Sequence, residues 1–177
     1  MRRRLGGSCA LIVSFACACV AVSASAQRRK PRAAARKQYG KLCPDPTAAC
    51  PTGDVTFEPY DLPFVLPKRA VIFESEEFYA VILESVRAPS PDDCEKFVPE
   101  SDRLAAQKLF PRRKVFTSRC SEPVRVYYTN IAPAQRIMAV YAGATRAEAE
   151  RALAEVKATG KFPGANLRRM RAGINGT

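Results

Sequence analysis

Residues 138–170 read MAVYAGATRAEAERALAEVKATGKFPGANLRRM, and this stretch predicts a strand, a helix, a turn and a second strand in direct succession. An apolar, β-favouring run that includes Ile137, Met138, Val140 and Tyr141 stops at Gly143. Thr145 is the expected N-cap of the helix, because its hydroxyl can accept a free backbone N–H and Glu148 can reach back to close a capping box. A capped helix should therefore follow the strand at once.

This helix is expected to bury one apolar stripe and to end at Gly160, which adopts a left-handed conformation without a Cβ clash. Helical spacing is shown by Ala149, Ala152, Leu153 and Val156. The FPG sequence at 162–164 then turns the chain, and residues 166–171 are expected to form the second strand.

The first 26 residues have the pattern of a secretory signal peptide. Three arginines at 2–4 precede an apolar run over 11–22, and an A-x-A cleavage site ends at Ala26. An uncleaved membrane anchor is the alternative, but the run is shorter than the roughly 20 apolar residues that a span needs. We therefore expect residues 1–26 to be removed and the protein to be periplasmic or secreted.

The remaining chain is basic and long enough for one domain. The full sequence has a formal net charge of +12, and the first 26 residues contain three arginines and no acid, so the mature charge is +12 − 3 = +9. The 177 − 26 = 151 residues that remain can bury a core of ordinary size.

Four cysteines follow the leader, and an even number in an exported chain indicates two disulfides, with three possible pairings. The proline-rich spacing between Cys43 and Cys50 favours a local loop, which leaves Cys94 to pair with Cys120. A zinc site is the alternative, but the chain has no CxxC pair and no histidine. No metal or other cofactor is expected.

Residues 27–42 are expected to be a disordered linker, because residues 27–41 contain seven lysines and arginines and no acid. The linker can be a plain tether. It can also adhere to anionic envelope polymers or lipid head groups, and both roles can hold together.

Residues 43–75 are expected to form a proline-rich, disulfide-containing arm. The prolines exclude a long helix and a central strand, and allow at most an edge strand over 63–66. Apolar residues such as Leu62 and Phe64 are too frequent for a free linker, so the arm should pack on the domain.

Residues 76–174 are expected to form the domain itself. The strongest strand signal is FYAVIL at 78–83, which should lie centrally in a sheet. A helix capped by Ser101 should run to Phe110, and strands are expected over 114–120 and 124–130. Without the strand over 124–130 the order is βαββαβ, which predicts an α+β, ferredoxin-like or RNP-like sandwich with one antiparallel sheet and both helices on one face.

The run over 140–169 resembles the second half of a sporulation-related repeat (SPOR) domain in its strand, TRAEAE helix start, alanine-rich stripe and FPGA turn. Residues 78–171 correspond to a whole domain of this family, and the second half matches better than the first. The resemblance implies a βαββαβ fold that binds peptidoglycan, favouring glycan strands without stem peptides, through the sheet face opposite the helices.

Strand alternation predicts which residues lie on that face. If Ala80 and Ile82 point towards the helices, their neighbours point away, and the later strands are assigned in the same manner. The candidate glycan-binding residues are Tyr79, Val81, Tyr141, Asn166 and Arg168. Aromatic platforms flanked by amide and guanidinium donors suit a sugar ring. In the alternative interpretation, the two tyrosines fill a half-buried face that the arm covers and blocks.

The leading prediction is an exported, non-catalytic envelope protein that binds peptidoglycan glycan strands. The alternative is a small disulfide-stapled periplasmic protein-binding module or inhibitor that presents a rigid loop with the strand over 124–130. An enzyme is disfavoured, because histidine is absent and no acid pair or phosphate loop occurs in a supporting context. Nucleic acid is not an expected partner in vivo, because the chain is predicted to be exported and lacks an RNA-recognition motif.

Overall fold

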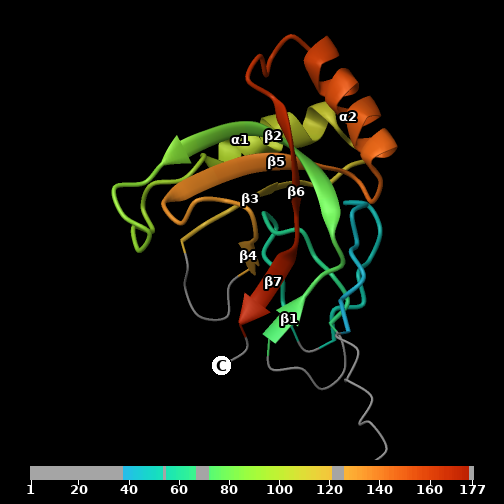
Figure 1. The fold of residues 1–177 in the computed structure, drawn as a ribbon, viewed down its shortest axis with the longest axis vertical. Helices are drawn as coiled ribbons and strands as arrows, with labels where there is room; N and C mark the ends of the chain where they lie inside the picture. The colour runs from blue at the N-terminus through green and yellow to red at the C-terminus, as the bar shows by residue number, and fades with distance from the viewer. Residues whose placement is uncertain (1–37, 54, 67–71, 121–125, 176–177) are drawn as a thin grey trace, which may run out of the picture. The chain divides into compact units, whose positions relative to one another are not determined.

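The computed structural model describes residues 38–53, 55–66, 72–120 and 126–175, which all belong to one compact unit (Figure 1). The predicted signal peptide and residues 27–37 of the predicted linker lie outside the described residues. No helix in the described ranges is long and apolar enough to cross a membrane.

The larger of two sheets has four antiparallel strands in the order β3-β5-β2-β6. Its strands are β2 (Phe78–Arg87), β3 (Val115–Thr117), β5 (Gln135–Gly143) and β6 (Asn166–Met170). The predicted central position of the FYAVIL segment is confirmed, because β2 pairs with β5 on one side and with β6 on the other.

Two helices, α1 (Glu100–Leu109) and α2 (Arg146–Ala158), pack on one face of this sheet (Figure 1). The predicted capping box of α2 is confirmed. The Thr145 hydroxyl accepts the Glu148 N–H at 3.3 Å, and the Glu148 carboxylate accepts the Thr145 N–H at 2.9 Å. The hydrogen bonds that the Thr145 N–H and hydroxyl donate to the carboxylate lower the pKa of Glu148, because they favour its charged form.

The predicted start of α1 at a Ser101 cap is wrong. The helix begins at Glu100, with Pro99 at the N-cap position and no side-chain cap hydrogen bond. Glu100 lies inside the first turn because its carboxylate binds the buried Arg103 guanidinium three residues later, with 2.9 Å from Nε to each oxygen. The two acids of this turn also complement the positive end of the helix dipole.

The predicted single sheet is wrong, because the structure has a second, three-stranded antiparallel sheet in the order β1-β7-β4. Its strands are β1 (Ile72–Glu74), β4 (Val126–Tyr128) and β7 (Ala172–Asn175). The extra strand thus finds its partner in β7, which continues from β6 after one residue. Gly173 allows this pairing, because a Cβ there would clash with the Tyr127 ring.

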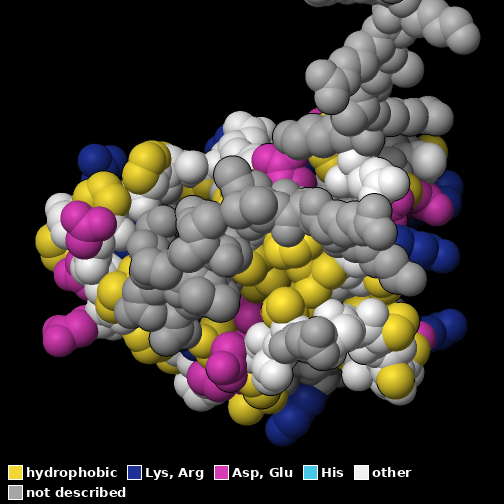
Figure 2. Space-filling model, turned by 90° about the horizontal axis from the view of Figure 1, so that it is seen from below, with side chains coloured by type: hydrophobic (Ala, Val, Ile, Leu, Met, Phe, Trp, Pro, Cys, Tyr) yellow, Lys and Arg dark blue, Asp and Glu magenta, His cyan; other side chains and the backbone are white. Residues whose placement is uncertain are grey.

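The arm packs on the domain, as predicted, and it covers the face of the larger sheet opposite the helices. Leu62 and Phe64 have no exposed surface, and Leu42 is also buried in the cluster formed there with Phe78 and Met170. The packed arm thus begins before residue 43. Figure 2 shows hydrophobic side chains gathered in the middle of the face seen from below, where the second sheet and the arm lie in Figure 1.

Backbone hydrogen bonds attach the arm at several places along its length. The Lys114 N–H donates to the Pro44 carbonyl at 2.8 Å, the Thr117 N–H donates to the Tyr60 carbonyl at 2.9 Å, and the Leu62 N–H donates to the Tyr128 hydroxyl at 3.0 Å. The edge strand that the prolines would allow over 63–66 does not form. Phe64 makes only an isolated bridge, and its partner Leu42 belongs to the arm itself.

Both predicted disulfides form, between Cys43 and Cys50 and between Cys94 and Cys120. The first closes a loop within the arm. The second joins the segment before α1 to the segment after β3, so it closes the loop that contains the crossover helix.

Leu62→Ala is expected to lower the free energy of unfolding by about 2–5 kcal/mol, because it leaves a cavity between the arm and the sheet. The matched control is Leu104→Ala, since Leu104 is 48% exposed on α1 and its truncation should change stability by about 0.5 kcal/mol or less. Urea denaturation measures both. Equal effects would show that the arm is not part of the cooperative fold.

Replacing the Cys94–Cys120 pair by alanine should destabilise the protein more than replacing the Cys43–Cys50 pair. The sequence separations are 26 and 7, and loop-closure entropy in the unfolded chain makes the difference about 1 kcal/mol. Urea denaturation of the two double variants measures it, and the reverse order would contradict the entropic explanation.

Candidate functional site

Tyr79 and Val81 do not lie on the face opposite the helices, so their predicted placement is corrected. Val81 is fully buried in the helix-side cluster with Val140, its partner across the β2–β5 ladder, and Tyr79 packs against the same cluster. Ala80 and Ile82 instead belong to the cluster under the arm. The sequence prediction assigned the two faces of β2 the wrong way round. The side chains on both faces are apolar and both faces are covered, so the sequence does not distinguish them.

Tyr141, Asn166 and Arg168 do lie on the face opposite the helices. Ala80 pairs with Tyr141 on one side and with Arg168 on the other, while Ile82 pairs with Asn166. Cross-strand partners share a face, so these three predicted residues and the arm occupy the same side of the sheet.

The three residues do not form one open platform. Ala80, which separates Tyr141 from Arg168, has no exposed surface and belongs to the cluster that the arm covers. Arg168 and Asn166 are exposed on the edge strand β6, whereas Tyr141 is half-buried and stacks on Phe78, with ring centroids 5.8 Å apart. The arm thus covers the middle of this face. Asn166 and Arg168 lie on one side of the covered part, on β6, and Tyr141 lies on the other side, on β5.

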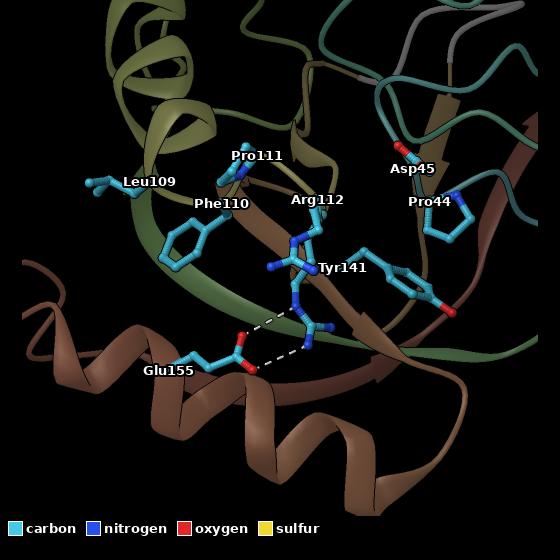
Figure 3. Close-up of a pocket in the computed structure, with 9 residues that line it drawn as sticks. Pro44, Asp45, Leu109, Phe110, Pro111, Arg112, Tyr141 and Glu155 are labelled. Atoms are coloured by element: carbon cyan, nitrogen blue, oxygen red, sulfur yellow. Dashed lines mark hydrogen bonds and ion pairs between the residues drawn. The ribbon is translucent and has the colours of Figure 1, made fainter.

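Tyr141 lines an open pocket of about 570 Å³ at the edge of the sheet (Figure 3). Segments far apart in the sequence meet there: the end of α1 and the turn after it, strand β5, helix α2 and the disulfide loop of the arm. The lining residues are Pro44, Asp45, Leu109, Phe110, Pro111, Arg112, Arg113, Tyr141 and Glu155. The pocket therefore combines apolar rings with charges of both signs.

Hydrogen bonds from the Gln107 side chain fix the turn over residues 110–113. The Arg113 N–H donates to the Phe110 carbonyl at 3.1 Å, which closes a β-turn with Pro111 and Arg112 at its centre. The Gln107 amide donates to the carbonyls of Phe110 and Arg113, each at 2.9 Å, and its oxygen accepts the N–H of Val115 at 2.9 Å. Arg112 is therefore presented from a backbone that is fixed on both sides.

The charged side chains of the pocket differ in the hydrogen bonds and ion pairs that they make. Arg113 forms an ion pair with Glu155, with Nε 3.4 Å from a carboxylate oxygen. Asp45 accepts both the N–H and the hydroxyl of Thr47, and these hydrogen bonds lower its pKa. Arg112 makes no hydrogen bond or ion pair with any of the described residues, and Figure 3 shows its side chain between those of Phe110 and Tyr141.

The pKa of Tyr141 is raised. Burial is the main cause, because it disfavours the phenolate, and the negative charges of Glu148 and Glu76 act in the same direction. The positive charge of Arg113 opposes them. Tyr141 thus keeps its hydroxyl proton through the neutral range and can act there as a hydrogen-bond donor beside its ring.

Sequence reasoning found Tyr141 but missed Arg112, Arg113 and Glu155. A local signal existed, since the predicted helix ends in Phe110 and Pro111 and two arginines follow directly. Nothing in the sequence showed that α2 and the arm approach the same turn. Among the described residues, no group of three or more acids, cysteines or histidines could hold a metal ion.

Comparison of the chain with protein-family models, with curated proteins and with solved structures finds no match in any of the three.

In a spectrophotometric titration, Tyr141→Phe should remove a phenol that ionises above the usual tyrosine value of about 10. Folding raises the pKa of Tyr141, so the unfolded chain releases this proton at a lower pH than the folded protein does. The contribution of the protonated Tyr141 to the free energy of unfolding is therefore complete below about pH 10, and it is lost as the pH rises through the pKa of the folded state. Tyr79→Phe is the control. Removal of a phenol with the usual value by the Tyr141 variant would contradict the half-buried placement.

Proposed function

We propose that the protein is an exported, non-catalytic envelope protein that binds glycan strands of peptidoglycan. The proposal is supported by the arrangement of the larger sheet, in which the order β2, α1, β3, β5, α2, β6 is βαββαβ. The antiparallel strand order of this sheet and the packing of both helices on one face support the proposal, because a ferredoxin-like domain has that arrangement. The resemblance of residues 140–169 to a SPOR domain is the second support.

The binding surface of this chain must differ from the open sheet face that the resemblance implies. The arm buries the middle of that face, with Leu62 and Phe64 fully enclosed, and it is fastened by backbone hydrogen bonds. Exposing the whole face would cost the burial of these side chains, about 1.5–3 kcal/mol each. We therefore locate glycan binding at the edge pocket.

Tyr141 in an open pocket is the observation that carries the proposal. A sugar ring has apolar C–H patches surrounded by hydroxyls, so it packs on an aromatic ring while donors and acceptors at the rim bind the hydroxyls. Tyr141 supplies the ring and a hydroxyl, Phe110 a second ring, and Arg113 and Glu155 the polar rim. A pocket of about 570 Å³ lies in the ordinary range for small ligands.

The two disulfides are compatible with an oxidising compartment, as the predicted leader requires. The alternative function, a protein-binding module that presents the strand over 124–130, has less support. Val126 and Tyr128 are buried within the second sheet, and Tyr128 accepts a hydrogen bond from the arm. Strand β4 therefore has a structural role.

The mature protein is expected to sediment with purified peptidoglycan sacculi, and more strongly with sacculi whose stem peptides have been removed by an amidase. A basic protein of similar size and charge serves as the control for nonspecific adhesion, because positive charge alone attracts anionic polymers. Sedimentation no stronger than that control at physiological salt would refute the proposal.

Tyr141→Leu should weaken sacculus binding by about 2- to 10-fold, because leucine keeps the packing on Phe78 but removes the ring and its hydroxyl. The matched control is Tyr79→Leu, which alters the helix side of the sheet and should bind like the wild type. A thermal melt of each variant verifies folding. A loss of binding confined to Tyr79→Leu would refute the edge pocket as the binding site.

A further inference from the structure

The Arg112 guanidinium makes no hydrogen bond or ion pair with the described residues, whereas each other charged side chain of the pocket has a direct partner. Glu155 is paired with Arg113, and Asp45 is hydrogen-bonded within its own turn. Arg112 has no such contact among the described residues, although it lies among the rings and acids that line the pocket (Figure 3). A guanidinium presented in this way is suited to an anionic ligand.

We infer that the edge pocket recognises a carboxylated sugar, with Arg112 binding the carboxylate and Tyr141 contacting the ring. The inference rests on the proposed function and specifies its ligand. In peptidoglycan the matching group is the lactyl carboxylate of muramic acid, which is free only where the stem peptide has been removed. The Arg112 contact thus provides a physical reason for preferring strands without stem peptides.

The preorganised turn supports this role for Arg112. Gln107 fixes the carbonyls on both sides of the turn before any ligand arrives, and proline at position 111 restricts the backbone further. Ligand binding then orders little beyond the arginine side chain itself, which keeps the entropic cost low. Gln107 is in this sense a positioning residue.

The two acids of the pocket, Asp45 and Glu155, determine the charge balance that an anionic ligand meets. Glu155 is paired with the cationic Arg113, whereas Asp45 accepts hydrogen bonds from the neutral N–H and hydroxyl of Thr47 and keeps its negative charge. They also make the lining neutral overall, with Asp45 and Glu155 balancing Arg112 and Arg113. Recognition of the carboxylate therefore depends on a direct contact with the Arg112 guanidinium, because the pocket lining has no net positive charge that could attract an anion.

Binding of soluble, amidase-denuded glycan strands should be measured by fluorescence or calorimetry and compared with the same strands after chemical reduction of the lactyl carboxylates to alcohols. We expect the reduced strands to bind about 10- to 100-fold more weakly, the effect of losing a charge-assisted hydrogen-bonded pair. Chitin oligomers, which lack the carboxylate, should bind as weakly as the reduced strands.

Arg112→Gln should weaken binding of the denuded strands by about the same factor and should leave binding of the reduced strands unchanged. Arg151→Gln is the control, because it removes one positive charge from an exposed position of α2 outside the pocket. Gln107→Met, which loosens the turn, should cause part of the Arg112→Gln loss while keeping the preference for carboxylate.

The outcomes separate this inference from the proposed function. Equal binding of denuded and reduced strands, or equal losses for Arg112→Gln and Arg151→Gln, would overturn carboxylate recognition while peptidoglycan binding stands. Absence of sacculus sedimentation by the wild type would overturn both. Carboxylate dependence that persists in Arg112→Gln would assign the contact to another residue and so refute the role of Arg112.

Discussion

Strand β2 buries side chains on both of its faces, and this constraint determines the rest of the architecture. Val81 and Leu83 pack under the helices, while Phe78, Ala80 and Ile82 pack under the arm. A sheet whose central strand is apolar on both sides needs a cover on each side. Two helices supply one cover, and the proline-rich arm together with the second sheet supplies the other.

The elements that could be predicted from the sequence are those determined by local chemistry. The capping box of α2 needs only Thr145 and Glu148, three residues apart, and the disulfide loop of the arm needs only the spacing of Cys43 and Cys50. The FYAVIL run was enough to identify a central strand. Packing of the arm also followed, because Leu62 and its apolar neighbours could not remain in water.

The elements that could not be predicted depend on long-range contacts. Alternation identifies a buried face only when the other face is polar, and in β2 both are apolar, so Tyr79 and Val81 were assigned to the wrong side. The second sheet could not be foreseen, because β4 pairs with a strand more than forty residues later. Arg112 was missed for the same reason: the pocket exists only where the arm and α2 reach the same turn.

The order β1-β7-β4 has a kinetic consequence. In this sheet neither outer strand touches the other, and each hydrogen-bonds only to β7, the last of the described strands in chain order. No hairpin between neighbours in sequence can nucleate it, so the entropy of closing long loops must be lost before any of its ladder forms. This sheet is thus assembled late, and a chain still emerging from its ribosome would carry it unformed.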